Sequence, residues 1–176
     1  QSPGVNLLSY TFNAQRSIHK GIETSVDWQP LVAVSPGLRF RLSHTWMKQT
    51  YDEYVERLTA GAFSQAFDRA GNAIPGITPN SLIARLGYDQ FEGALAGFGA
   101  YVEHTYRDEM WLDNANLIKA PGYTLTNLNV HYDTRRTSGA LKGLHLLFEV
   151  RNIADKVWVA SAGNLSNSLS ATTGLQ

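Results

Sequence analysis

The five histidines are the side chains best suited to acid–base chemistry or to metal binding, and their spacing argues against a metal site. They are His19, His44, His104, His131 and His145, and each falls in a different predicted strand. A zinc site built on one helix needs two histidines about four residues apart, and no two histidines of this sequence have that spacing. We therefore expect no direct metal site.

Cysteine and net charge exclude further classes of function. The sequence has no cysteine, which removes disulfides, thiolate metal sites and cysteine nucleophiles. Its 15 basic and 15 acidic residues give a net charge of zero, so there is no basic field to attract nucleic acid. Nucleic acid is therefore not an expected partner, and no cofactor is implied.

Aromatic and basic residues in long polar segments are better candidates for chemistry, in the form of ligand binding. Residues 52–80 and 108–121 carry many glycines and prolines and are predicted to be loops, as are residues 161–176. Arginine can pair with the anionic oxygens of a chelate, and aromatic rings can stack on a planar ligand. The predicted ligand-binding residues are Tyr51, Tyr54, Arg57, Arg69 and Trp111.

The elements that must position these residues are strands, because apolar and polar residues alternate with a period of two. Predicted strands cover residues 8–13, 18–28, 38–46, 82–89, 98–107, 127–133 and 144–151, with a partial strand at 157–160. Residues 53–67 have a spacing that also fits a short helix within the first long loop. Charges interrupt every apolar run, so no segment approaches the roughly 18 apolar residues of a transmembrane helix.

The connections between the strands alternate in length. Residues 29–37, 92–97 and 134–143 are short connections, whereas 52–80 and 108–121 are long. Up-and-down membrane barrels have short turns at one end and long loops at the other. Aromatic residues near the predicted strand ends would suit the two membrane interfaces: Trp28, Trp46, Tyr51, Tyr106, Trp111, Tyr132 and Trp158.

The sequence thus predicts an all-β chain, an antiparallel up-and-down transmembrane β-barrel segment of about 7–8 strands. Alternation alone fits a soluble β sandwich equally well, because that fold buries the apolar face that a barrel turns to lipid. In the barrel, opposite charges on neighbouring strands would pair along the lumen. The predicted lumen charges are Glu23, Asp27, Arg39, Arg41, Arg85, Asp89, Glu103, Arg107, Asp133, Glu149 and Arg151.

Five short motifs resemble TonB-dependent outer-membrane receptors in type and order. They are Ser-Ile-His-Lys-Gly-Ile-Glu at residues 17–23, Pro-Gly-Leu at 36–38, Ile-Pro-Gly-Ile at 74–77, Pro-Gly-Tyr-Thr-Leu at 121–125 with Asn-Leu at 127–128, and Val-Arg-Asn-Ile-Ala-Asp-Lys at 150–156. The last resembles a signature near the end of these receptors, with Ile153 for the usual leucine and Trp158 where tyrosine is common.

The resemblance implies a siderophore receptor in the Gram-negative outer membrane that imports a ferric siderophore or a similar metal chelate and catalyses no reaction. Its barrel has about 22 strands around a plug. Residues 1–176 would then be part of the barrel domain, without the plug, the segment that contacts the TonB energy-transducing complex, or the final strand. Outer-membrane lipid would surround it. Haem is a less expected ligand, because no predicted loop contains a histidine.

Two other membrane classes stay open beside the soluble sandwich. A barrel hydrolase would need a histidine and an acid at the outer rim, whereas His131 and Asp133 are expected to line the lumen near the periplasmic side. A self-contained small barrel with a structural or adhesive role would need its first and last strands to pair, and residues 1–6 and 171–176 have the composition of loops.

Overall fold

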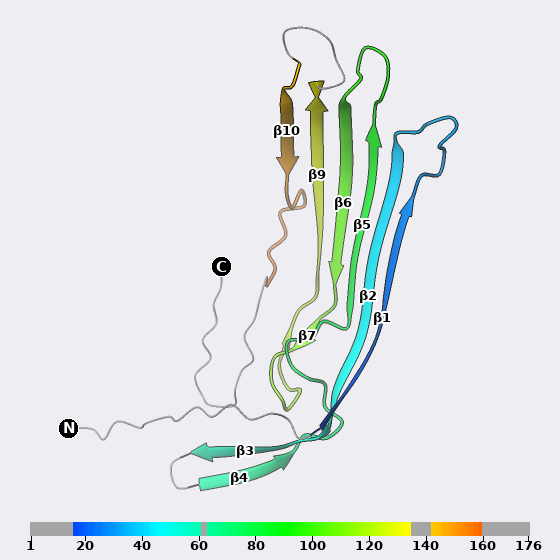
Figure 1. Cartoon of the computed structure of the whole chain (residues 1–176). Coiled ribbons are helices and arrows are strands. Elements are labelled where there is room, and N and C mark those ends of the chain that lie inside the picture. The colour runs from blue at the N-terminus through cyan, green and yellow to red at the C-terminus, as the bar shows by residue number, and fades with distance from the viewer. Residues whose placement is uncertain (1–15, 61–62, 135–141, 160–176) are drawn as a thin grey trace, which may run out of the picture.

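A six-stranded antiparallel sheet dominates the computed structural model, which describes residues 16–60, 63–134 and 142–159. Its strand order is β1-β2-β5-β6-β9-β10, and every neighbouring pair is antiparallel (Figure 1). The strands are β1 (Arg16–Trp28), β2 (Leu38–Glu53), β5 (Asn80–Asp89), β6 (Phe98–Arg107), β9 (Tyr123–Asp133) and β10 (His145–Val150). In these described ranges no helix has the length and apolar character needed to cross a bilayer. The predicted all-β, up-and-down order is confirmed.

The two ends of this sheet differ, as the connection lengths predict. Residues 29–37, 90–97 and 134–144 join strands at one end, which we call the turn end. Residues 54–79 and 108–122 join strands at the opposite end, the loop end (Figure 1). This asymmetry is typical of membrane barrels, in which the long loops face outward from the cell.

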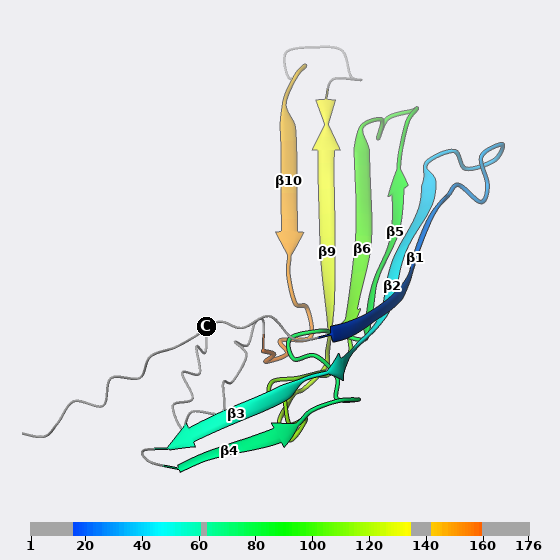
Figure 2. The same ribbon diagram turned by 60° about the horizontal axis from the view of Figure 1, so that its bottom comes forward.

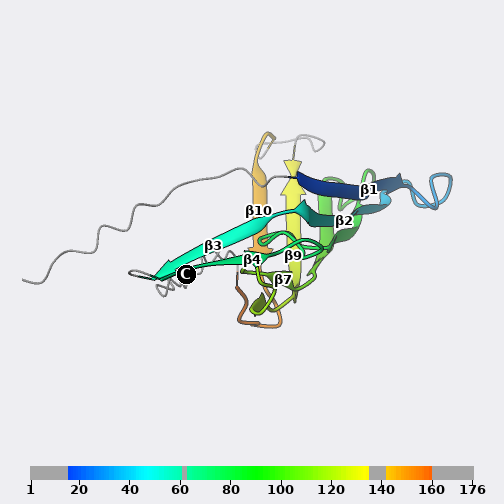
Figure 3. The ribbon, with the colours of Figure 1, turned by 90° about the horizontal axis from the view of Figure 1, so that it is seen from below.

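The long connections contain strands of their own. The first holds the hairpin of β3 (Val55–Ala60) and β4 (Phe63–Asp68), and the second pairs β7 (Met110–Trp111) with β8 (Lys119–Ala120). The prediction that residues 52–80 form only loop is therefore wrong, as is the helix considered for 53–67. The β3–β4 hairpin projects from the loop end of the sheet (Figure 2) and, viewed along the strands, extends from β2 towards the β9 and β10 side (Figure 3).

Other boundaries also differ from the sequence-based expectation. Strand β2 continues from residue 46 to Glu53, because β1 pairs with it as far as Glu53 and residues 72–79 form backbone hydrogen bonds with it. Residues 157–159 are not a strand, so the predicted partial strand at 157–160 is not present in its described part. The predicted strand at 8–13 lies outside the described residues.

One face of the sheet, which we call the outer face, is largely apolar, although it also carries the polar side chains of Thr24, His44, His104 and Thr126. Successive strands place apolar side chains opposite one another, as in the row of Trp28, Phe40, Leu86, Val102 and Leu128. Several are widely exposed: Trp28 is 57% exposed, Leu86 55% and Val102 45%. An exposed apolar surface this broad is expected to face lipid or a partner and not water.

The opposite, inner face carries paired charges. Asp27 forms ion pairs with Arg39 and Arg41 on the neighbouring strand. In each pair the arginine Nε lies 3.1 Å from a carboxylate oxygen of Asp27. Arg85 Nε donates to Glu103 Oε2 at 3.1 Å on the next pair of strands. The predicted cross-strand pairing of lumen charges is confirmed at these positions.

A glycine on the inner face lets two polar side chains from strands two apart meet. Gly99 of β6 stands between Asp89 of β5 and His131 of β9 in the register of the sheet. His131 Nε2 lies 2.9 Å from Asp89 Oδ1, and a Cβ atom on Gly99 would overlap both side chains. Glycine in a strand interior weakens the strand, so its use here fits the need for close approach.

Aromatic side chains mark both borders of the apolar surface. Towards the turn end lie Trp28, Tyr88, Phe98 and Tyr132, and towards the loop end lie Trp46 and Tyr106. Trp46 is inside β2, yet it stands opposite Asn80, the first residue of β5, so it marks the level at which the sheet begins to open. Amphipathic rings at two such levels are typical of the membrane interfaces.

Candidate functional site

A buried polar cluster at the loop end joins the β3–β4 hairpin to the second long connection. It consists of Tyr51, Tyr54, Glu56, Arg69 and Asn114, which we call the loop-end cluster. Tyr51 has the same strand parity as Arg39 and Arg41, so the cluster lies on the inner side of the sheet. Tyr51 and Glu56 are 8% and 7% exposed, and Asn114 is 7% exposed.

Asn114 stands at the centre of this cluster. Its Oδ1 accepts a hydrogen bond from the Tyr51 hydroxyl at 2.8 Å, and its Nδ2 donates to Glu56 Oε1 at 2.8 Å. Glu56 Oε2 accepts the Nε–H of Arg69 at 2.9 Å. The guanidinium carbon of Arg69 lies 4.9 Å from the centre of the Phe67 ring. Buried polar groups must be paired in this way, because an unpaired one costs about 1–3 kcal/mol.

The loop that carries Asn114 is held rigid by its own side chains. The Asp113 carboxylate is 2% exposed and accepts backbone N–H bonds from Leu117 and Ile118, at 2.9 and 2.8 Å. Asn116, at a positive φ of 55°, pairs through its side-chain amide with both backbone groups of Ala73. Residues 113–118 are therefore fixed to the first long connection at two points.

The two tyrosines of the cluster form an aromatic pair. Their ring centres are 4.5 Å apart and the rings are tilted by 34°. Tyr54 lies beyond the end of β2, and burial raises the pKa of its hydroxyl, with a further contribution from Glu56. Tyr54 therefore stays neutral at physiological pH, and its hydroxyl oxygen accepts a hydrogen bond from Asn114 Nδ2 at 3.5 Å.

Three of the five predicted ligand-binding residues come together in this cluster, and two do not. Tyr51, Tyr54 and Arg69 are neighbours, with Tyr51 and the Arg69 guanidinium largely enclosed by other side chains. Arg57 is exposed on the hairpin, and Trp111 lies in β7. Sequence reasoning missed Glu56 and Asn114, since isolated polar residues in a predicted loop give no signal of burial.

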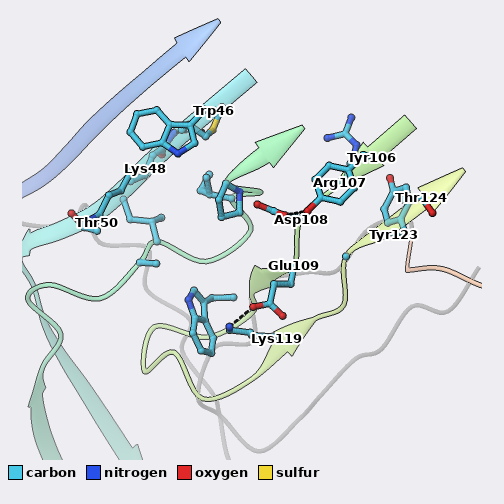
Figure 4. Close-up of a pocket in the computed structure, with 18 of the residues that line it drawn as sticks. Trp46, Lys48, Thr50, Tyr106, Arg107, Asp108, Glu109, Lys119, Tyr123 and Thr124 are labelled. Atoms are coloured by element: carbon cyan, nitrogen blue, oxygen red, sulfur yellow. Dashed lines mark hydrogen bonds and ion pairs between the residues drawn. The ribbon is translucent and has the colours of Figure 1, made fainter. Parts of the chain in front are cut away.

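Trp111 lines a second feature, a pocket of about 830 Å³ at the loop end (Figure 4). Trp46, Lys48 and Tyr106, which belong to the outer face by strand parity, form part of its wall. The Nζ atom of Lys119 lies 4.2 Å from the centre of the Trp111 ring, and it forms an ion pair with Glu109. Met47, Gln49 and Arg107, which have inner-face parity, line the pocket as well, and we call this space the loop-end pocket.

The two features differ from a metal centre in their side chains. The described residues contain no group of three or more His, Asp and Glu side chains that could hold a metal ion. His131, the histidine considered for hydrolysis, is part of the inner-face pairing with Asp89. The loop-end cluster offers aromatic rings, amides and one ion pair, which is chemistry for binding and positioning.

Comparison with known proteins agrees with this architecture. Residues 1–153 match the family model described as TonB dependent receptor-like, beta-barrel. A ferrioxamine receptor of Yersinia enterocolitica is 31% identical over 121 residues, which is 64% of this chain and 16% of that receptor. The chain thus spans about a sixth of the length of that relative. On these matches, the chain belongs to the TonB-dependent receptor-like β-barrel family.

Proposed function

We propose that this chain forms part of the wall of an outer-membrane receptor that imports a ferric siderophore and is energised through the TonB complex. The observation that carries the proposal is the 31% identity to a ferrioxamine receptor, over a stretch that takes up 64% of the chain. Ferrioxamine is accordingly the first ligand to test. The protein acts in binding and transport and not as an enzyme.

The two faces of the sheet support a position in the outer membrane. The outer face presents apolar side chains between two levels of aromatic rings, as a lipid-facing wall requires. The inner face pairs its charges across neighbouring strands, which suits a hydrated lumen. A soluble sandwich would bury the apolar face, and in the described part of the chain no second layer covers it.

The loop-end cluster supports a role in binding at the mouth of the barrel. We propose that Tyr54, Arg57 and Trp111 contact the ligand, since each keeps part of its side chain accessible. Tyr51 and Arg69 are predicted to act mainly by holding the hairpin in place, because their polar atoms are bound to Asn114 and Glu56.

Uptake of radioactive iron supplied as ferrioxamine tests this function. Cells that express the full-length receptor should accumulate the label, and cells lacking the receptor should not. Collapse of the proton gradient, or loss of TonB, should abolish uptake while surface binding persists. Binding and uptake that do not depend on the receptor would refute the proposal, and uptake that survives without TonB would refute its energetic part.

A further inference from the structure

Two lysines face each other directly on the outer side of the sheet. Lys20 of β1 and Lys48 of β2 are register partners, and both side chains are exposed. Like charges at directly opposed positions destabilise a strand pair. Among the described residues neither lysine forms an ion pair, and the acid further along the same face of β2, Asp52, is bound by Arg16. The pair therefore carries two uncompensated positive charges.

Their level in the sheet places this charge just beyond the apolar surface. Lys20 and Lys48 follow Ile22 and Trp46 by two residues towards the loop end, on the same face. Trp46 marks the loop-end aromatic level, so the next outward-facing pair reaches the depth of lipid head groups. Lysine at that depth can extend its ammonium group to the polar layer while its methylenes cover apolar surface.

The loop-end pocket contains a third lysine, which contacts Thr124, a residue of outer-face parity. Lys48 and Lys156 both line the pocket, and Lys156 Nζ donates to Thr124 Oγ1 at 2.7 Å. The acids of the pocket are occupied by other groups: Asp108 accepts from Tyr106 and Asn80, and Glu109 is paired with Lys119. Four basic side chains and two acidic ones line the pocket, so it has an excess of positive charge, and Lys48 lies next to Trp46 (Figure 4).

We propose that Lys20, Lys48 and Lys156 bind the phosphate groups of an anionic lipid in the outer leaflet. The inference rests on the proposed location in the outer membrane, with the loop end outside. A lipid fits better than free phosphate, because the lysines border an exposed apolar wall that would hold the acyl chains of the same molecule. The lipid phosphates also offset the repulsion between Lys20 and Lys48.

Native mass spectrometry of the full-length receptor in detergent tests the site, with lipid A carrying two phosphates as the probe. The wild-type receptor should retain this lipid at least about tenfold better than the same lipid with its phosphates removed, since a charge-assisted hydrogen bond contributes more than 1.4 kcal/mol. The double variant Lys20→Gln/Lys48→Gln should lose that preference. Lys142→Gln, which changes an exposed lysine at the turn end, should keep it.

Each alternative has its own outcome. Equal retention of the two lipids by the wild type would overturn the proposal without the use of any variant. Binding of inorganic phosphate alone, with displacement of lipid A, would identify a free anion as the ligand and overturn the lipid assignment. An equal loss in Lys142→Gln would indicate general charge attraction and also overturn it. Ferrioxamine uptake by cells that express the same receptor separates the two proposals. Intact uptake without phosphate selectivity in the purified receptor refutes only this site, and the reverse result refutes only the proposed ligand.

Discussion

Replacing Glu56 by alanine should release the β3–β4 hairpin from residues 113–118. The change removes both the acceptor of the Arg69 Nε–H and the acceptor of the Asn114 amide. The Arg69 and Glu56 side chains are only 14% and 8% exposed, so a charge is left enclosed without its partner. Breaking a buried pair in this way costs about 3–5 kcal/mol.

Hydrogen exchange of the full-length receptor measures this cost locally. The backbone N–H groups of Arg69, Gly71 and Ala73 donate to acceptors on Tyr54, Tyr51 and Asn116, so their protection depends on the docked hairpin. A loss of 3 kcal/mol corresponds to a roughly 100-fold faster exchange of these amides. Amides in the middle of β6 should keep their protection, because β6 contributes no residue to the cluster.

The matched control is Glu53→Ala. Glu53 pairs with Arg16 at 3.0 Å, and both side chains are about 60% exposed, at 59% and 62%. Exposed ion pairs contribute about 0–1 kcal/mol, so exchange at residues 69–73 should rise by less than about fivefold. Equal exchange in the Glu56 variant and the wild type would refute the reasoning, as would an equal effect of the two variants.

Further predictions concern the inner face and the ligand. Gly99→Ala should lower the temperature at which the barrel loses its heat-modifiable gel mobility, because the new Cβ separates His131 from Asp89; an unchanged transition would contradict the close approach. The pKa of Tyr54 is raised in the folded protein, so its contribution to stability is complete below the ordinary pKa of 10.0. That contribution is lost as the pH rises through the pKa of Tyr54 in the folded protein. Tyr54→Phe removes the titrating hydroxyl and should therefore reduce the loss of hydrogen-exchange protection in the hairpin at alkaline pH. Trp111→Ala should weaken ferrioxamine binding by about 1 kcal/mol or more, measured as a roughly fivefold or greater rise in Kd; an unchanged Kd would remove Trp111 from the ligand contacts.

The sheet could be predicted from the sequence because each strand has two chemically different faces. Alternation between apolar and polar residues fixed the position and parity of β1, β5, β6 and β9 to within a few residues. Register and inner-face pairing then follow from the antiparallel order, as Asp27 with Arg41 and Arg85 with Glu103 illustrate.

The structure of the loop end could not be predicted from the sequence, since it depends on contacts between residues far apart in the chain. Residues 53–67 lack a clear apolar face, so local pattern did not separate helix from hairpin. What holds the hairpin is the contact of Glu56 with Asn114, 58 residues further along the chain. The opposition of Lys20 and Lys48 likewise appears only once the register of β1 and β2 is known.

A single-cysteine scan along β6 tests whether the outer face of the sheet contacts membrane lipid. Residues 1–176 contain no native cysteine. Spin labels at successive positions from Tyr101 to Tyr106, in the full-length receptor in lipid bilayers, report contact with oxygen in lipid or with a water-soluble relaxation agent. A lipid-facing outer face predicts alternation with a period of two. Labels at Val102, His104 and Tyr106 should lie in lipid, and labels at Tyr101, Glu103 and Thr105 should contact water or protein. Uniform water exposure of all six positions, or the opposite phase, would contradict a lipid-facing receptor wall.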